Sequence, residues 1–160
     1  MSRDFILEAP VRGTVSPLAQ VPDRAFADEM LGPGIALDPT DTGTVTVGAP
    51  AAGLIRTIHP HAFVLQVSPK LAALVHLGID TYRAGADQFK MLIEPGRYVN
   101  RMEPIIEWNI DRTVESKFAP WVVVTILGFH TDEMSLTPAV EYGDRVCPGQ
   151  QILQLHCDQD

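Results

Sequence analysis

The sequence has few cysteines, few basic side chains and no long apolar run. Its two cysteines, Cys147 and Cys157, form no C-x-x-C pair, so we expect reduced thiols or small core residues. With 12 Lys and Arg against 20 Asp and Glu, the formal net charge of −8 argues against a nucleic-acid partner. No apolar run reaches the roughly 18 residues of a membrane span, and acidic side chains stand where a signal peptide is basic. We therefore expect a cytoplasmic protein with no direct membrane insertion.

Glycine and proline are frequent instead, with 12 glycines and 13 prolines among 160 residues. Because they recur every several positions, they favour short strands joined by turns over long helices. The length corresponds to a single domain, residues 1–160, with an ordered core over about 5–155.

Two pairs of segments echo each other. Residues 9–16 (APVRGTVS) match 49–56 (APAAGLIR), with Gly13 and Gly53 in the same place, and residues 94–99 (EPGRYV) match 141–146 (EYGDRV). Short glycine-led repeats of this kind are typical of a sheet that folds over on itself. They predict an all-β fold: a compact antiparallel β-sandwich or barrel with duplicated motifs and one or two short helical turns.

Residues 21–32 have helical spacing, with Asp23 as a cap and Gly32 as the end. Phe26, Met30 and Leu31 then form an apolar stripe, which suits either core packing or an exposed docking patch. Residues 33–39 and 42–47 have the pattern of a hairpin.

The most informative stretch is 71–82 (LAALVHLGIDTY), which has the pattern of a strand carrying a histidine. Alternation places Leu74, His76 and Gly78 on one face, with Asp80 four residues beyond His76. A lone strand histidine is more often a hydrogen-bonded core side chain than a functional group. Gly78, however, has no side chain, which leaves room beside the ring and lets backbone N–H groups approach.

A second histidine changes this balance. Residues 61–67 form a predicted strand, and antiparallel pairing with 71–79 through a turn at 68–70 brings His61 opposite His76, within one position. Two histidines facing each other across a hairpin favour a functional site.

Several motifs together resemble the IIA domain of the glucose-type phosphoenolpyruvate-dependent sugar phosphotransferase system, over roughly residues 5–155. The matching segments are Val21-Pro-Asp, Phe26-Ala-Asp, Gly32-x-Gly-Ile-Ala, Ala49-Pro-x-x-Gly53, His61-Ala-Phe, Leu74-Val-His-Leu-Gly-Ile-Asp-Thr81 and Phe89. The chain departs from the family pattern at five places: Arg24-Ala25, His59-Pro60, Pro69-Lys70, Tyr82 and Met102.

The resemblance implies a phosphocarrier with an antiparallel β-sandwich fold. The histidine matching His76 would accept a phosphoryl group from the phosphocarrier protein HPr and pass it to a cysteine on the IIB domain of a sugar permease. The histidine matching His61 would lie beside it and help to hold the phosphate. The chain would thus be a phosphotransferase component that requires no cofactor.

The chemistry of phosphoryl transfer suits these residues, because it needs a neutral in-line nucleophile surrounded by donors. We expect His76 to be the nucleophile and His61 an N–H donor to the phosphoryl oxygens. Supporting roles are expected for Gly78, through backbone donors, for Thr81, and for Asp80, which would fix the loop or a ring tautomer. An apolar rim of Phe26, Met30 and Leu31 would exclude water and seat both partners.

Two alternatives stay open. Facing histidines also suit a zinc ion, so His61 and His76 are candidate zinc ligands, and related β folds include zinc hydrolases. The sequence places no aspartate four residues after His61 and no His-x-His pair after His76, which such hydrolases need. Alternatively, the phosphohistidine would serve as a regulatory signal, with enzymes or transporters binding according to phosphorylation state.

Overall fold

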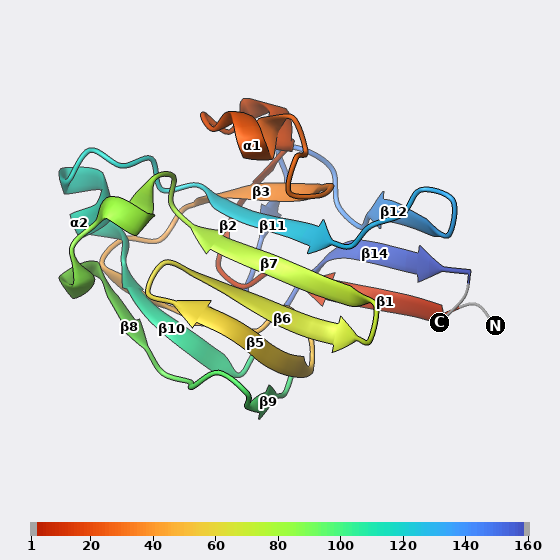
Figure 1. Cartoon of the computed structure of the whole chain (residues 1–160). Helices are drawn as coiled ribbons and strands as arrows, with labels where there is room; N and C mark the ends of the chain where they lie inside the picture. Colours follow the sequence, from red (N-terminus) through yellow and green to blue (C-terminus); the bar gives the residue numbers. More distant parts are fainter. Residues whose placement is uncertain (1–2, 159–160) are drawn as a thin grey trace.

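The computed structural model describes residues 3–158, and its strands form three antiparallel sheets (Figure 1). The largest has the order β13-β2-β3-β11-β7-β6-β5-β9. Its strands are β2 (Gly13–Ser16), β3 (Gly34–Pro39), β5 (Gly53–His59), β6 (Ala62–Ser68), β7 (Leu71–Leu77), β9 (Tyr98–Val99), β11 (Val122–Leu127) and β13 (Arg145–Val146).

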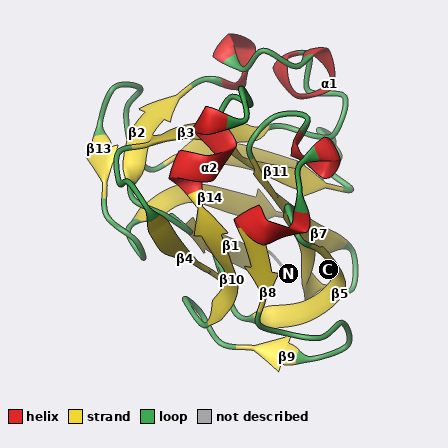
Figure 2. Cartoon of the chain, turned by 90° about the vertical axis from the view of Figure 1, so that its left-hand side faces the viewer, coloured by secondary structure: helices red, strands yellow, loops and turns green. Residues whose placement is uncertain are grey.

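Two smaller sheets complete the fold, in the orders β1-β14-β12 and β4-β10-β8. They contain β1 (Arg3–Glu8), β4 (Thr44–Gly48), β8 (Phe89–Met91), β10 (Pro104–Asn109), β12 (Met134–Pro138) and β14 (Gln151–Cys157). The helical elements are short: α1 (Arg24–Ala27), α2 (Ile110–Glu115) and the 3-10 turns η1 (Leu18–Gln20), η2 (Thr81–Arg83) and η3 (Ala86–Gln88). Figure 2 shows how small this helical part is beside the strands. The predicted all-β class is confirmed. Within residues 3–158, no helix has the length and apolar character needed to cross a bilayer.

The duplicated motifs predicted from the echoes occupy equivalent places in the large sheet. Gly13 of β2 pairs with Val146 of β13, and Gly53 of β5 pairs with Val99 of β9. The turns that follow also match. Gly149 donates its N–H to the Ala9 carbonyl at 2.9 Å, and Met102 donates its N–H to the Ala49 carbonyl at 2.8 Å. Both turn residues have a positive φ, +85° at Gly149 and +59° at Met102, so the methionine keeps the glycine's conformation.

Apolar side chains fill two separate cores. The main core lies between the sheets and includes the fully buried Trp108, Phe63 and Leu65. A smaller outer cluster forms beneath α1 on the other face of the large sheet. Its members are Leu18, Val21, Phe26, Ala36, Ile79 and Val123. This outer cluster adjoins the predicted site, because Val123 of β11 is the cross-strand neighbour of His76.

Two local predictions are wrong. Asp23 does cap α1, accepting from the N–H groups of Ala25 and Phe26, but the helix ends at Ala27 and not at Gly32. Glu29 adopts a left-handed φ of +57°, which a continuing helix cannot contain.

The expected hairpin of residues 33–39 and 42–47 also does not form. β3 pairs with β2 and β11, whereas β4 pairs with β10 in another sheet. Gly34 allows this arrangement, because a side chain there would collide with the Val124 backbone of β11. Alternation identified both strands, but it carries no information about which sheet each one joins.

Candidate functional site

His76 lies near the end of β7, where the large sheet meets the outer cluster. Its neighbours Val75 and Leu77 are fully buried in the main core, while the His76 ring points to the opposite face and is partly buried. The centroid of the Phe26 ring lies 5.0 Å from that of His76, so α1 covers one side of the imidazole. The face predicted from alternation is therefore confirmed.

A backbone carbonyl fixes the orientation of this ring. Nδ1 of His76 lies 2.7 Å from the carbonyl oxygen of Gly78. Since a carbonyl only accepts, Nδ1 must carry the hydrogen, and in the neutral ring Nε2 keeps its lone pair. Burial lowers the pKa of His76, opposed by the Gly78 carbonyl and by the charges of Asp23 and Asp80. At neutral pH the ring is thus neutral, with the lone pair at Nε2.

The turn after β7 keeps this carbonyl in place. Gly78 has a φ of +76° and Asp80 a φ of +60°. The hydroxyl of Thr81, 2% exposed, donates to the Leu77 carbonyl at 2.5 Å and closes the turn. A side chain at Gly78 would collide with the methyl group of Thr81, so the sequence Gly-x-x-Thr is needed for the fold of this turn.

The structure corrects the expectations for Gly78 and Asp80. The N–H of Gly78 donates to the Trp121 carbonyl at 2.8 Å, and the N–H of Ile79 donates to the Ala119 carbonyl at 2.9 Å. These donors are occupied, and the space beside the glycine holds the Thr81 methyl group. The tautomer of His76 is set by the Gly78 carbonyl, and the charge of Asp80 opposes the lowering of the pKa of the ring. The carbonyl of Asp80 accepts from the N–H of Arg83 at 3.1 Å, and the expectation that Asp80 fixes the loop stays a prediction.

His61 stands beside His76, as predicted. The two ring centroids are 5.0 Å apart and the rings meet edge to face at 76°. In the β6–β7 ladder it is Ala62 that pairs with His76, one position from the expected register. His61 lies in the turn before β6 and not in the strand itself. Its ring therefore does not follow the strand alternation, which would place it on the same face as the buried Phe63. Its own carbonyl accepts from the N–H of Leu77 at 2.8 Å.

The electrostatic environment keeps His61 neutral as well. Its pKa is lowered from 6.5 to about 4, first by burial and then by the positive charges that His76 and His59 carry when protonated. A neutral imidazole at pH 7 has one N–H to donate.

A third histidine belongs to this cluster and was not assigned a role from the sequence. The ring of His59 stacks on that of His61, with centroids 6.0 Å apart and planes inclined by 28°. His59 is exposed, and the His-Pro-His spacing that places both rings on one side of the turn was visible in the sequence.

The three predicted docking residues do not share one surface. Phe26 is 4% exposed and belongs to the outer cluster against His76. Met30 and Leu31 are 71% and 40% exposed, but they line a depression with Ile126 and Phe129 at the far end of β11. Phe26 packs against the His76 ring, and the docking role of Met30 and Leu31 stays a prediction.

His61 and His76 are also the candidate zinc ligands. Among residues 3–158, no group of three or more His, Cys, Asp or Glu side chains has the arrangement of a metal site. Zinc held by His61 and His76 alone stays a prediction.

Comparisons with known proteins identify the family of the chain. Residues 5–131 match the family model of the phosphoenolpyruvate-dependent sugar phosphotransferase system, EIIA 1. The chain belongs to this family. The family comprises the phosphocarrier domains of sugar transport, so the predicted resemblance is confirmed.

Curated relatives are longer proteins. The N-acetylglucosamine-specific EIICBA components of Klebsiella pneumoniae and Escherichia coli (strain K12) are 44% and 42% identical over 107 residues. The matched segment covers 66% of this chain but only 16% of each relative. This EIIA chain thus corresponds to a small part of each of them.

Solved structures share the fold. The IIA domain of the glucose permease from Mycoplasma capricolum superposes with a TM-score of 0.77 at 25% identity, over 95% of this chain and 96% of that one. A deep-sea M23 metalloprotease, pseudoalterin, superposes with a TM-score of 0.52 at 10% identity, over 92% of this chain and 98% of that one, which is a likeness of fold alone. The family match and the histidine geometry do not favour the zinc hydrolase alternative.

Proposed function

We propose that His76 accepts a phosphoryl group at Nε2 from HPr and passes it to a cysteine on the IIB domain of a sugar permease. The observation that supports this most directly is the contact between Nδ1 of His76 and the Gly78 carbonyl. It commits Nδ1 to donation and leaves Nε2 as the nucleophilic atom. Because the ring cannot turn without losing this hydrogen bond, the nucleophile is positioned before the donor arrives.

The transfer needs no proton at the attacking atom. The lone pair of Nε2 forms a bond to phosphorus as the bond to the donor breaks, and the positive charge on the ring is shared with Nδ1–H. The Gly78 carbonyl faces that N–H and stabilises the cationic phosphoimidazole. The reverse sequence releases the group to the next acceptor and restores the neutral ring.

His61 supplies a hydrogen-bond donor beside the reacting atom. The centroid of its ring lies 5.0 Å from that of His76, so a phosphoryl group on Nε2 of His76 would lie near both rings. A negative phosphoryl group raises the pKa of a neighbouring imidazole, so His61 changes from the neutral form towards the protonated form when His76 is loaded. Its affinity for the phosphoryl oxygens then increases with phosphorylation.

The first permease partner to test is an N-acetylglucosamine permease, because the curated relatives carry that specificity. HPr and a IIB domain would both approach the exposed side of the histidine pair, and this requires a cytoplasmic location. A regulatory role of the same phosphohistidine would appear as partner proteins that bind only one phosphorylation state.

The deciding experiment is the intact mass of the protein after incubation with phosphoenolpyruvate, enzyme I and HPr. We expect the mass of one phosphoryl group, lost in mild acid and absent in His76→Ala. The exposed His130→Ala is the matched control and should still be phosphorylated. Acid-labile phosphorylation that persists in His76→Ala would overturn the assignment.

A further inference from the structure

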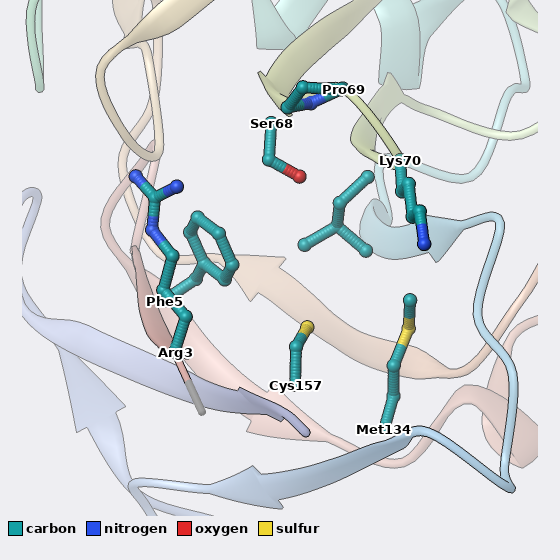
Figure 3. Close-up of a pocket in the computed structure, with 8 residues that line it drawn as sticks. Arg3, Phe5, Ser68, Pro69, Lys70, Met134 and Cys157 are labelled. Atoms are coloured by element: carbon teal, nitrogen blue, oxygen red, sulfur yellow. The ribbon is translucent and has the colours of Figure 1, made fainter. Parts of the chain in front are cut away.

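A cavity of about 360 Å³ lies away from the histidines, between the β1-β14-β12 sheet and the turn that joins β6 to β7 (Figure 3). Leu71, the first residue of β7, lines it, whereas His76 stands near the other end of the same strand. The volume is in the range of small-molecule sites. Phosphoryl transfer as described above makes no use of this cavity.

Apolar groups form its interior. The ring of Phe5 and the side chain of Met134 point into the space, with the sulfur of Cys157 between them (Figure 3). Leu71 and Met134 are 3% and 7% exposed, so the inner wall is shielded from bulk solvent. An interior of this kind accepts an aliphatic chain.

The rim carries positive charge and a hydroxyl group. Arg3 and Lys70 stand on opposite sides of the cavity, and the Ser68 hydroxyl is directed inward (Figure 3). The guanidinium of Arg3 lies 4.9 Å from the centroid of the Phe5 ring, which holds it above the apolar wall. Within residues 3–158, neither Arg3 nor Lys70 forms an ion pair with a carboxylate. In a chain with a formal net charge of −8, two such cations at one small cavity favour an anionic ligand.

We propose that this cavity binds an aliphatic carboxylate. The hydrocarbon chain lies among Phe5, Leu71 and Met134, and the carboxylate is held at the rim by Arg3 and Lys70, with Ser68 as a further donor. Guanidinium and ammonium groups both form charge-assisted hydrogen bonds with carboxylates. The proposal does not depend on the phosphotransfer function.

The methionines allow a site-specific test. The protein with ¹³C-labelled methionine methyl groups is titrated with sodium hexanoate at constant ionic strength, with 1-hexanol and hexylammonium as probes of equal chain length. Met134 lines the cavity, while Met30 and Met91 are exposed elsewhere and report non-specific contact. Met134→Leu identifies the signal. We expect hexanoate alone to shift the Met134 methyl group saturably, with little change at Met30 and Met91.

Two variants and two controls test the charges. Arg3→Gln and Lys70→Gln should each raise the dissociation constant by about twofold to fivefold, which is the effect of losing one exposed charge pair. The exposed Arg145→Gln and Lys90→Gln make the same charge changes away from the cavity and should leave it unchanged. Unaltered Met30 and Met91 signals show that the variants remain folded.

The outcomes separate the explanations. Equal binding of hexanol, or equal shifts at Met30 and Met91, would mean non-specific hydrophobic contact and would overturn the proposal. Equal weakening by Arg145→Gln and Lys90→Gln would mean a general charge effect and would overturn it as well. The proposal would also be rejected if the Met134 methyl signal did not shift at about 10 mM hexanoate. The dissociation constant would then exceed that of specific small-ligand sites.

Discussion

His76 and His61 face each other across the same site, but the chain holds them in different ways. His76 stands on a central strand, packed by Phe26 and tied to the Gly78 carbonyl through Nδ1. His61 lies in a turn between strands, with the exposed ring of His59 stacked on it. The first environment fixes the tautomer of the ring and leaves the lone pair at Nε2. The second lowers the pKa of His61 to about 4, and no backbone carbonyl is recorded as a partner of its ring in the described part of the chain.

Under the proposed function, this difference divides the work of one reaction between the two rings. A nucleophile benefits from backbone contacts, because these change little when neighbouring side chains change. A stabilising group benefits from an adjustable environment, because it must respond to a phosphoryl group that is present only part of the time.

The largest expected effect comes from removing each histidine in turn. His76→Ala should abolish phosphoryl acceptance, because no other ring has its Nε2 positioned by the same carbonyl. His61→Gln should still accept the group, because its amide N–H can donate. It should pass the group on about 10-fold more slowly, because glutamine cannot become cationic and its neutral hydrogen bond is weaker than a charge-assisted one. Rapid-quench phosphotransfer with HPr and a IIB domain measures both steps. Loss of acceptance in His61→Gln equal to that in His76→Ala would contradict the division of roles.

Phe26→Ala tests the packing on the His76 side. Removing this buried ring should lower the free energy of unfolding by about 3 kcal/mol, through lost burial and the cavity left behind. It should also raise the pKa of His76 towards 6.5, because burial is the main cause of its depression. Urea unfolding and an NMR titration measure the two effects. The exposed Met30→Ala should change stability by less than about 0.5 kcal/mol.

Thr81→Val tests the turn that supports the Gly78 carbonyl. The valine removes the hydroxyl that donates to the Leu77 carbonyl, so the free energy of unfolding should fall by about 1–2 kcal/mol. The exposed Thr57→Val is the control. A stability loss in Thr81→Val without slower phosphoryl acceptance would show that the turn does not position the His76 ring.

The smallest effect concerns pH and the His61 side. The pKa of His61 is about 4 in the folded protein and near 6.5 in the unfolded chain, so the unfolded chain binds more protons between these values. The stability that the neutral ring contributes is therefore complete above about pH 6.5 and is lost as the pH falls towards 4. His61→Gln should make unfolding less dependent on pH in this window. His59→Ala should raise the pKa of His61 slightly, which NMR titration of the ring would detect.

The sequence contained enough to predict the class of fold and the two histidines. The echoes around Gly13 and Gly53 identified the duplicated motifs, because each glycine lies where another backbone passes too close for a side chain. Alternation along 71–77 gave the face of His76 because one side of this strand is wholly buried. In both cases the signal was contained in a short segment of the sequence.

Other features depended on partners far away in the chain. The N–H groups of Gly78 and Ile79 are used by Trp121 and Ala119, some forty positions later, and no local pattern showed that these donors were taken. The same limit applies to β3 and β4, which follow one another in the sequence but join different sheets. The stacking of His59 on His61 depended on the shape of a turn that propensities do not fix.

The pairing of β1 with β14 has a consequence for any longer polypeptide that contains this fold. Arg3 pairs with Cys157, so both ends of the described chain emerge together (Figure 1). They do so beside Leu71, and His76 lies five residues along the same strand, roughly 16 Å away. Neighbouring ends of this kind tolerate circular permutation and insertion into a host loop. A partner tethered at either end would start from the side remote from the histidines, so its linker must reach around the sheet to deliver it to His76.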